Sequence, residues 1–180
     1  MTARDIKYKI IRRIAGPCLV VFLFIIMSGG CSNGECYDNK NSLPLAGFYS
    51  SSERPQAISL DSISIIGIGA PGDSVLQDSV RNISEVYLPF RIDENSTTYE
   101  IKYLAGMAGK LKLNDIITFN YDIVPMFVSS ACGAVYYYKI TSIEYSENFI
   151  DSVVCPTGEI TNLNRENLKI YFRVSLEEEE

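Results

Sequence analysis

The chain has 180 residues, which is enough for one domain with a single hydrophobic core. It contains no histidine and no tryptophan, which excludes histidine-based acid–base catalysis, serine–histidine and cysteine–histidine nucleophile pairs, and most zinc sites. Residues 1–30 hold five basic side chains and one acidic one, so residues 31–180 keep 11 basic and 21 acidic side chains, a net charge of −10. Such a surface repels phosphate groups, and no nucleic-acid partner is expected.

Residues 1–30 have the pattern of an export signal. A basic segment ends at Arg13, and the uncharged run 14–27 follows it. Fourteen helical residues reach about 21 Å, which is less than the roughly 30 Å hydrocarbon layer of a bilayer. We therefore expect a signal helix that is cleaved off rather than a permanent membrane anchor.

Small residues lead from Ser28 to Cys31 at the end of this run. The region resembles a bacterial lipoprotein signal, in which the cysteine is acylated and becomes the first residue. Ser28 departs from that pattern, because an aliphatic residue usually stands at its position. The sequence predicts a lipid on Cys31 and a tether over residues 31–42; ordinary cleavage and an uncleaved anchor are the alternatives. The expected location is the outer membrane, with its periplasmic and cell-surface faces both open.

Three cysteines remain in the exported part, namely Cys36, Cys132 and Cys155. An oxidising compartment allows one disulfide and one leftover thiol, and the spacing alone does not choose among the three pairings. We favour a Cys36–Cys132 bridge because it would fix the first strand to the body of the domain. In the chain-entropy model, a loop of about a hundred residues stabilises by up to about 4.7 kcal/mol. Three buried, reduced thiols are the alternative.

Short alternating segments predict an all-β domain over residues 43–176. The strongest signal is 117–123, where apolar residues alternate with Thr118, Asn120 and Asp122. Further strands are expected at 43–49, 57–68, 86–91, 99–103, 135–143, 148–154 and 168–174.

Two details of this pattern are informative. The isoleucines of 57–68 change parity near Asp61-Ser62, so a switch of face or a bulge is expected there. Segments 86–91 and 99–103 flank the polar residues 93–96 and are predicted to pair as a hairpin. Together, seven to nine strands indicate an antiparallel β-sandwich, immunoglobulin-like or Greek-key, after the signal helix. A closed barrel is the alternative, and the acidic tail 177–180 is expected to be disordered.

Five stretches occur in order along the chain: 65–69 followed by Asp73-Ser74, then 88–90, 115–121, 130–133 and 150–151. Together they resemble a family of small lipoproteins from Bacteroidetes whose domain has no assigned function. The resemblance spans residues 31–174 and implies a lipid-anchored β-sandwich of the cell envelope. It matches Cys132-Gly133 and Cys36 to cysteine positions of the family. It also implies an outer-membrane β-barrel protein as a partner to test.

No group of residues predicts catalysis, a cofactor or a metal centre. Asp-Ser pairs begin at residues 61, 73, 78 and 151 and are interpreted as turn residues. Asp93, Glu94 and Glu100 suggest calcium, but no known calcium-loop spacing connects them, and they are interpreted as solvated charges. The tyrosines at 136–138 suggest a sugar-binding platform; alternation places Tyr136 and Tyr138 on one face and Tyr137 on the other, with at least one in the core.

We therefore expect a non-enzymatic interaction or structural module, held at the membrane by the lipid on Cys31, with an envelope or outer-membrane protein as its partner. The alternative is a surface lipoprotein that binds a glycan or calcium. Exposed tyrosines around a groove would favour a ligand. An apolar patch beside an open strand edge would favour a protein partner.

Overall fold

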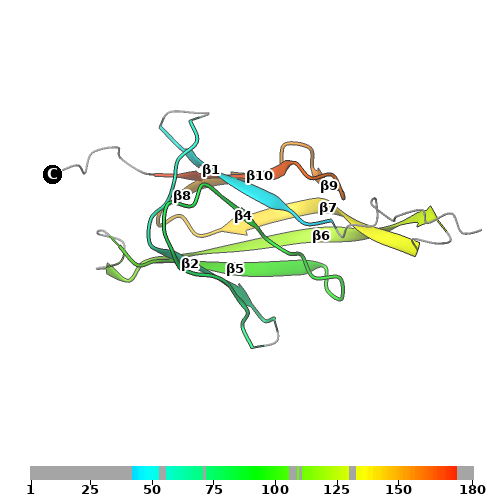
Figure 1. Cartoon of the computed structure of the whole chain (residues 1–180), viewed down its shortest axis with the longest axis horizontal. Helices are drawn as coiled ribbons and strands as arrows, with labels where there is room; N and C mark the ends of the chain where they lie inside the picture. Colours follow the sequence, from blue (N-terminus) through cyan, green and yellow to red (C-terminus); the bar gives the residue numbers. More distant parts are fainter. Residues whose placement is uncertain are drawn as a thin grey trace, which may run out of the picture. The chain divides into compact units, whose positions relative to one another are not determined.

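The computed structural model describes residues 42–52, 56–70, 72–105, 109, 111–129 and 133–173. These residues are nearly all strand and form two packed sheets (Figure 1). The signal segment, the tether before Ser42 and the acidic tail lie outside the described residues. Within the described part of the chain, no helix has the length and apolar character needed to cross a membrane.

The sheets contain four and six strands. The smaller has the order β4 (Glu85–Tyr87), β1 (Leu45–Ser50), β10 (Glu166–Phe172) and β8 (Ile150–Val154). The larger has the order β3 (Val75–Val80), β2 (Ile63–Ile68), β5 (Ser96–Tyr103), β6 (Asn114–Ser129), β7 (Gly133–Tyr145) and β9 (Glu159–Ile160). The predicted all-β sandwich is confirmed. Its pairing is antiparallel except between β1 and β10, the first and last strands, which run parallel.

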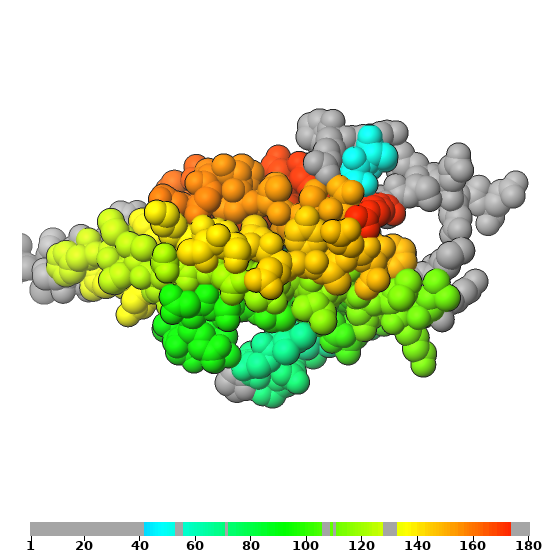
Figure 2. Space-filling model, turned by 180° about the vertical axis from the view of Figure 1, so that it is seen from behind, coloured from blue at the N-terminus to red at the C-terminus, as the bar shows by residue number. Residues whose placement is uncertain are grey.

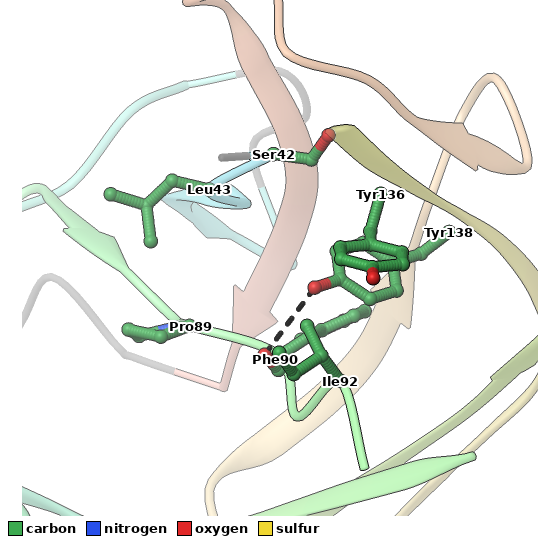
Figure 3. Close-up of a pocket in the computed structure, with 7 residues that line it drawn as sticks. All are labelled: Ser42, Leu43, Pro89, Phe90, Ile92, Tyr136 and Tyr138. Carbon is green, nitrogen blue, oxygen red and sulfur yellow. Dashed lines mark hydrogen bonds between the residues drawn. The ribbon is translucent and has the colours of Figure 1, made fainter. Parts of the chain in front are cut away.

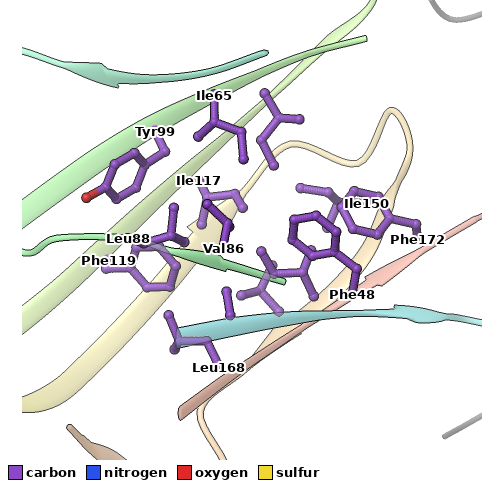
Figure 4. Packing of buried hydrophobic residues seen from close by; sticks show 14 of the residues in the cluster. Phe48, Ile65, Val86, Leu88, Tyr99, Ile117, Phe119, Ile150, Leu168 and Phe172 are labelled. Carbon is purple, nitrogen blue, oxygen red and sulfur yellow. The ribbon is translucent and has the colours of Figure 1, made fainter. Parts of the chain in front are cut away.

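The core forms where the inner faces of the two sheets meet (Figure 4). Alternation brings Ile117, Phe119 and Tyr121 of β6 inward, and each is at most 1% exposed. From the smaller sheet, Phe48 meets the edge of Phe172 with ring centroids 5.4 Å apart. The alternation predicted for 117–123 is confirmed, because the smaller sheet covers one face of the larger sheet.

The chain changes face between Leu60 and Ile63, as predicted. Both side chains are buried although they are three positions apart, a spacing that places side chains on opposite faces of a regular strand. Ser62 makes this possible with a φ of 54°, in the left-handed region. The predicted strand at 57–68 is therefore too long: β2 begins only at Ile63, and Leu60 instead makes an isolated bridge with Ile83.

The predicted hairpin of 86–91 with 99–103 is wrong. β4 pairs with β1 in the smaller sheet, whereas β5 lies between β2 and β6 in the larger one. Residues 88–91 carry the chain between the sheets, with Leu88 and Phe90 buried. Their alternation resembles that of a strand because one side of this crossing segment packs against the core. Pro89, which lacks an N–H, suits a segment outside a ladder.

Three tyrosine hydroxyls hold the crossing segment. They donate to three consecutive carbonyls: Tyr99 to Pro89, Tyr138 to Phe90 at 3.5 Å and Tyr121 to Arg91 at 2.9 Å. These bonds supply partners that backbone carbonyls otherwise find in a ladder. We call Tyr99, Tyr121 and Tyr138 the tyrosine clamp. Phe90 lies among its rings, stacked on Tyr121 at 4.6 Å and edge-on to Tyr138 at 5.3 Å.

The clamp predicts that stability falls at alkaline pH. Burial raises the pKa of all three clamp tyrosines, that of Tyr138 to about 12. Unfolded tyrosines ionise near pH 10. Because the folded values are higher, the clamp stabilises fully below pH 10, and its contribution is lost as the pH rises from 10 towards 12. Urea unfolding at a series of pH values should show this fall. Tyr138→Phe should make the fall in the free energy of unfolding above pH 10 smaller, whereas Tyr136→Phe should leave it unchanged. The same pH dependence in both variants would contradict the clamp.

Asp115 on β6 is a second polar element of the core, and it is fully buried. Its carboxylate accepts hydrogen bonds from two hydroxyls, of Tyr103 at 2.8 Å and Ser146 at 2.6 Å. It also accepts three backbone N–H groups, those of residues 148, 149 and 150, at 3.0, 2.9 and 3.2 Å. This one side chain therefore fixes the connection between β7 and the start of β8.

Candidate functional site

Strands β6 and β7 continue past the end of β5 as a two-stranded ribbon (Figure 1). β5 begins at Ser96, opposite Asn120. Tyr121 still bonds to the carbonyl of Asn95, but beyond it β6 has no further strand beside it on that side in the described part of the chain. We call the ribbon of residues 123–127 and 133–138 the arm.

The arm exposes apolar side chains on both of its faces. Phe127 and Tyr136 lie on the face that continues the core face of the sheet, and they are 73% and 38% exposed. Val124 and Met126 lie on the opposite face and are 38% and 42% exposed. Figure 2 shows atoms of β6 in yellow-green and of β7 in yellow projecting at the left of the view. Such a concentration of apolar side chains is unusual on a free surface.

The arm also lacks charge. Asp122 and Lys139 face each other in the β6–β7 register, and the sixteen residues between them, 123–138, include no charged side chain. Sequence reasoning missed the arm because it ended the first of these strands at 123 and began the second at 135, whereas β6 continues to Ser129 and β7 begins at Gly133. The uncharged run bounded by two opposite charges is the signal that would have found it.

A pocket of about 170 Å³ lies at the base of the arm (Figure 3). We call it the basal pocket, and its lining residues are Ser42, Leu43, Pro89, Phe90, Ile92, Tyr136 and Tyr138. Leu43 and Ile92 are exposed at its rim, while Ser42 is buried and its hydroxyl has no hydrogen-bond partner. A cavity of this size accommodates a benzene ring. The basal pocket is therefore suited to one apolar side chain rather than to a large ligand.

The three consecutive tyrosines lie as the alternation predicts. Tyr136 and Tyr138 share one face and both line the basal pocket. Tyr138 is in the core, and Tyr136 lies at the rim. Tyr137 is on the other face, where its hydroxyl bonds to Asn162 at 2.9 Å. The surface around the pocket thus has one exposed tyrosine of the three and aliphatic neighbours.

The acidic residues considered for calcium take part in ion pairs. Arg91 contacts both Asp93 and Glu94 at 2.9 Å, and its hydrogen bond lowers the pKa of Asp93. Glu100 lies 3.4 Å from the Lys102 ammonium. Within the described ranges, no group of three or more potential ligands is arranged to hold a metal ion.

The turn interpretation of the Asp-Ser pairs is wrong for two of the four, because the pairs that begin at 78 and 151 lie within β3 and β8, whereas those that begin at 61 and 73 lie outside the strands. Asp73 accepts the N–H of Gly69 at 3.1 Å in the turn between β2 and β3, which confirms its turn role. Asp61 accepts the N–H of Asn82 at 3.3 Å. Asp78 bonds to the hydroxyls of Ser79 and Ser64 at 3.0 and 3.3 Å. All three carboxylates therefore accept hydrogen bonds from within the domain.

The predicted lipid and disulfide sites, Cys31, Cys36 and Cys132, lie outside the described residues. Cys155 follows β8, is half-buried and carries a free thiol. Its sulfur lies 4.0 Å from the Thr157 hydroxyl. The Cys36–Cys132 pairing therefore stays a prediction.

A family model, described as a family of unknown function (DUF6452), matches residues 62–172. The match covers more than half of the chain and runs from the start of β2 to the end of β10, so that it includes the tyrosine clamp, Asp115 and the arm. No curated protein and no solved structure matches the chain. The chain therefore belongs to the DUF6452 family, a family of unknown function.

Proposed function

We propose that this chain is a lipid-anchored protein of the cell envelope that acts as a non-enzymatic interaction module. The signal pattern of residues 1–30 and the cysteine at 31 support the anchor. The observation that carries the interaction role is the apolar surface made by the arm and the basal pocket. The two sheets bury the core residues of the domain, but Phe127, Ile92 and Leu43 stay exposed at the arm and the basal pocket.

The surface favours a macromolecular partner over a glycan. Its exposed residues are mainly aliphatic, and the ring best placed for stacking, Tyr138, is buried. The basal pocket has the size of a site for one anchoring side chain, and such pockets dominate binding energy at protein interfaces. An outer-membrane β-barrel protein is the partner we propose, and binding of a glycan or calcium stays the alternative.

Photo-crosslinking in intact cells tests this role. A photoreactive amino acid at position 92, on the rim of the basal pocket, should give one dominant crosslinked envelope protein. The same amino acid at position 75, which is also exposed but lies on β3, should not. Equal crosslinking at both positions, or none at position 92, would contradict the proposal.

We also propose that Cys36 and Cys132 form a disulfide. In the sequence, Cys132 lies between β6 and β7, so this bridge would join the tether to the far end of the arm. Peptide mapping without reduction should recover the two cysteines in one linked pair, with Cys155 unlinked.

A further inference from the structure

The walls of the basal pocket favour an aromatic side chain. Three of its seven lining residues carry aromatic rings, namely Phe90, Tyr136 and Tyr138, and Figure 3 shows them opposite Leu43 and Pro89. An inserted ring gains energy from edge-to-face and offset-stacked neighbours, in addition to the burial of its own surface. The volume of about 170 Å³ is sufficient for one such ring.

The polar groups of these walls are largely committed to the fold. The carbonyl oxygens of Pro89 and Phe90 already accept hydroxyl groups of the tyrosine clamp. The Ser42 hydroxyl is buried, so it does not present a polar atom to an entering group. A polar group inserted here would lose its hydrogen bonds to water without replacement. The pocket therefore favours a hydrocarbon ring, that of phenylalanine.

The rings that line the pocket are held in place by their neighbours. Phe90 is stacked on Tyr121 with 4.6 Å between the ring centroids. Tyr138 meets these two rings edge-on, at 5.3 Å from Phe90 and 5.1 Å from Tyr121. A partner side chain would therefore enter without first ordering the aromatic wall, which lowers the entropic cost of binding.

The rim of the pocket beside Ile92 is negatively charged. Asp93 and Glu94 follow Ile92 in the sequence, and their side chains are 68% and 52% exposed. Both contact Arg91 at 2.9 Å, but the Arg91 side chain is only 24% exposed. One cation against two carboxylates leaves a net charge of −1 at this rim, and residues 31–180 as a whole carry −10. Positive charge on a partner is therefore attracted to the rim, and negative charge is repelled.

We propose that the basal pocket binds a phenylalanine side chain of the partner protein, and that lysine or arginine residues next to this phenylalanine contact Asp93 and Glu94. This inference rests on the proposed function, and it adds the chemistry by which the partner is recognised. The ring supplies most of the affinity, because buried anchors dominate the binding energy of an interface. The rim charges increase the rate of association and exclude acidic segments.

Short peptides test the recognition of the ring and of the charge. A fluorescent, capped peptide with one phenylalanine between two lysines should bind the full-length lipidated protein in phosphatidylcholine nanodiscs, as measured by fluorescence anisotropy against empty nanodiscs. Alanine in place of the phenylalanine should weaken binding about tenfold or more. Glutamates in place of the lysines should weaken it several-fold at low salt, and high salt should reduce this difference. Equal binding in either comparison would overturn the proposal.

Two variants place the recognition of the ring at the basal pocket. Ile92→Asn should remove the preference for the phenylalanine peptide over the alanine peptide, because it replaces an apolar part of the rim. Val75→Asn changes an exposed residue of β3 and should keep the preference. Both side chains are more than half exposed, so both variants should fold. A preference that survives in Ile92→Asn would assign the peptide to another surface and overturn the proposal.

A second pair of variants tests the charged rim. Glu94→Lys should reduce the preference for the lysine peptide over the glutamate peptide, while Asp93 still holds Arg91. Glu85→Lys makes the same change of charge at an exposed position of β4 and should leave the preference unchanged. Equal effects of the two variants would show that only the overall charge of the domain acts, and this would overturn the role of the rim.

The photo-crosslink at position 92 separates this inference from the proposed function. One dominant crosslinked envelope protein, together with peptides that are not distinguished, would overturn the phenylalanine anchor and leave the interaction module intact. A crosslink to a second copy of the chain, or to the chain's own tether, would assign the pocket to that occupant and overturn both proposals. No crosslink at position 92 would remove the proposed function on which this inference depends.

Discussion

Replacing Phe119 with alanine is expected to lower the free energy of unfolding by about 3–5 kcal/mol. The Phe119 ring is fully buried, with ring centroids 5.1 Å from Phe90 and 6.4 Å from Tyr99. Its removal would leave a cavity beneath the tyrosine clamp, because Tyr99 is held by its hydroxyl bond and Phe90 by its stacking on Tyr121, so that neither ring can collapse into the space. Urea denaturation should show a lower midpoint with an unchanged slope.

Phe127→Ala is the matched control for this variant. Phe127 lies on the same strand and the same face, eight residues further on, but is 73% exposed. We expect its loss to change stability by less than about 0.5 kcal/mol. A similar loss for both variants would mean that the arm is part of the cooperative core. The division of β6 into a structural half and a binding half would then be wrong.

Asp115→Ala is expected to have the second large effect and to lower the free energy of unfolding by about 3–4 kcal/mol. The substitution leaves three backbone N–H groups and two hydroxyls without their shared acceptor. Asp115→Asn keeps one oxygen but turns an N–H₂ group towards these donors, so it should lose a large part of the same energy. Hydrogen exchange should accelerate at the amides of residues 148–150.

Asp122→Ala is the corresponding control, because Asp122 lies seven residues away on the same strand and is exposed. The free energy of unfolding of Asp122→Ala should stay within about 0.5 kcal/mol of that of the parent protein. If the amides of residues 148–150 keep their protection in Asp115→Ala, the carboxylate does not hold this connection, and another contact must position β8.

The parts of the fold that the sequence predicted are those with strong local patterns. Residues 117–123 alternate over a full strand, and burial of one face enforces this pattern. The parity change at Asp61-Ser62 likewise had a local cause, the left-handed φ of Ser62. By contrast, β3 was missed because Gln77, Asp78 and Ser79 give it little apolar periodicity, and it lies at a sheet edge.

Other features depend on contacts between distant segments. The parallel pairing of β1 with β10 joins the two ends of the domain, and no local signal specifies it. The segment 88–91 has the alternation of a strand, but its carbonyls bond to tyrosines from β5, β6 and β7 instead of to a neighbouring strand. In the sequence Asp115 has no feature that distinguishes it from an exposed polar residue. Its role depends on the fold, which brings residues 146–150 beside it. The basal pocket could not be predicted either, because its lining residues come from three separate parts of the chain.

Mass analysis of the N-terminal peptide from the native protein tests the proposal that acylated Cys31 holds this domain at the envelope membrane. We expect a peptide that begins at Cys31 and carries a diacylglyceryl thioether on its sulfur. Cys18→Ala should leave this peptide unchanged, because residue 18 lies in the segment that is removed. A peptide that begins at Met1, or a Cys31 with a free thiol in the mature protein, would contradict the claim.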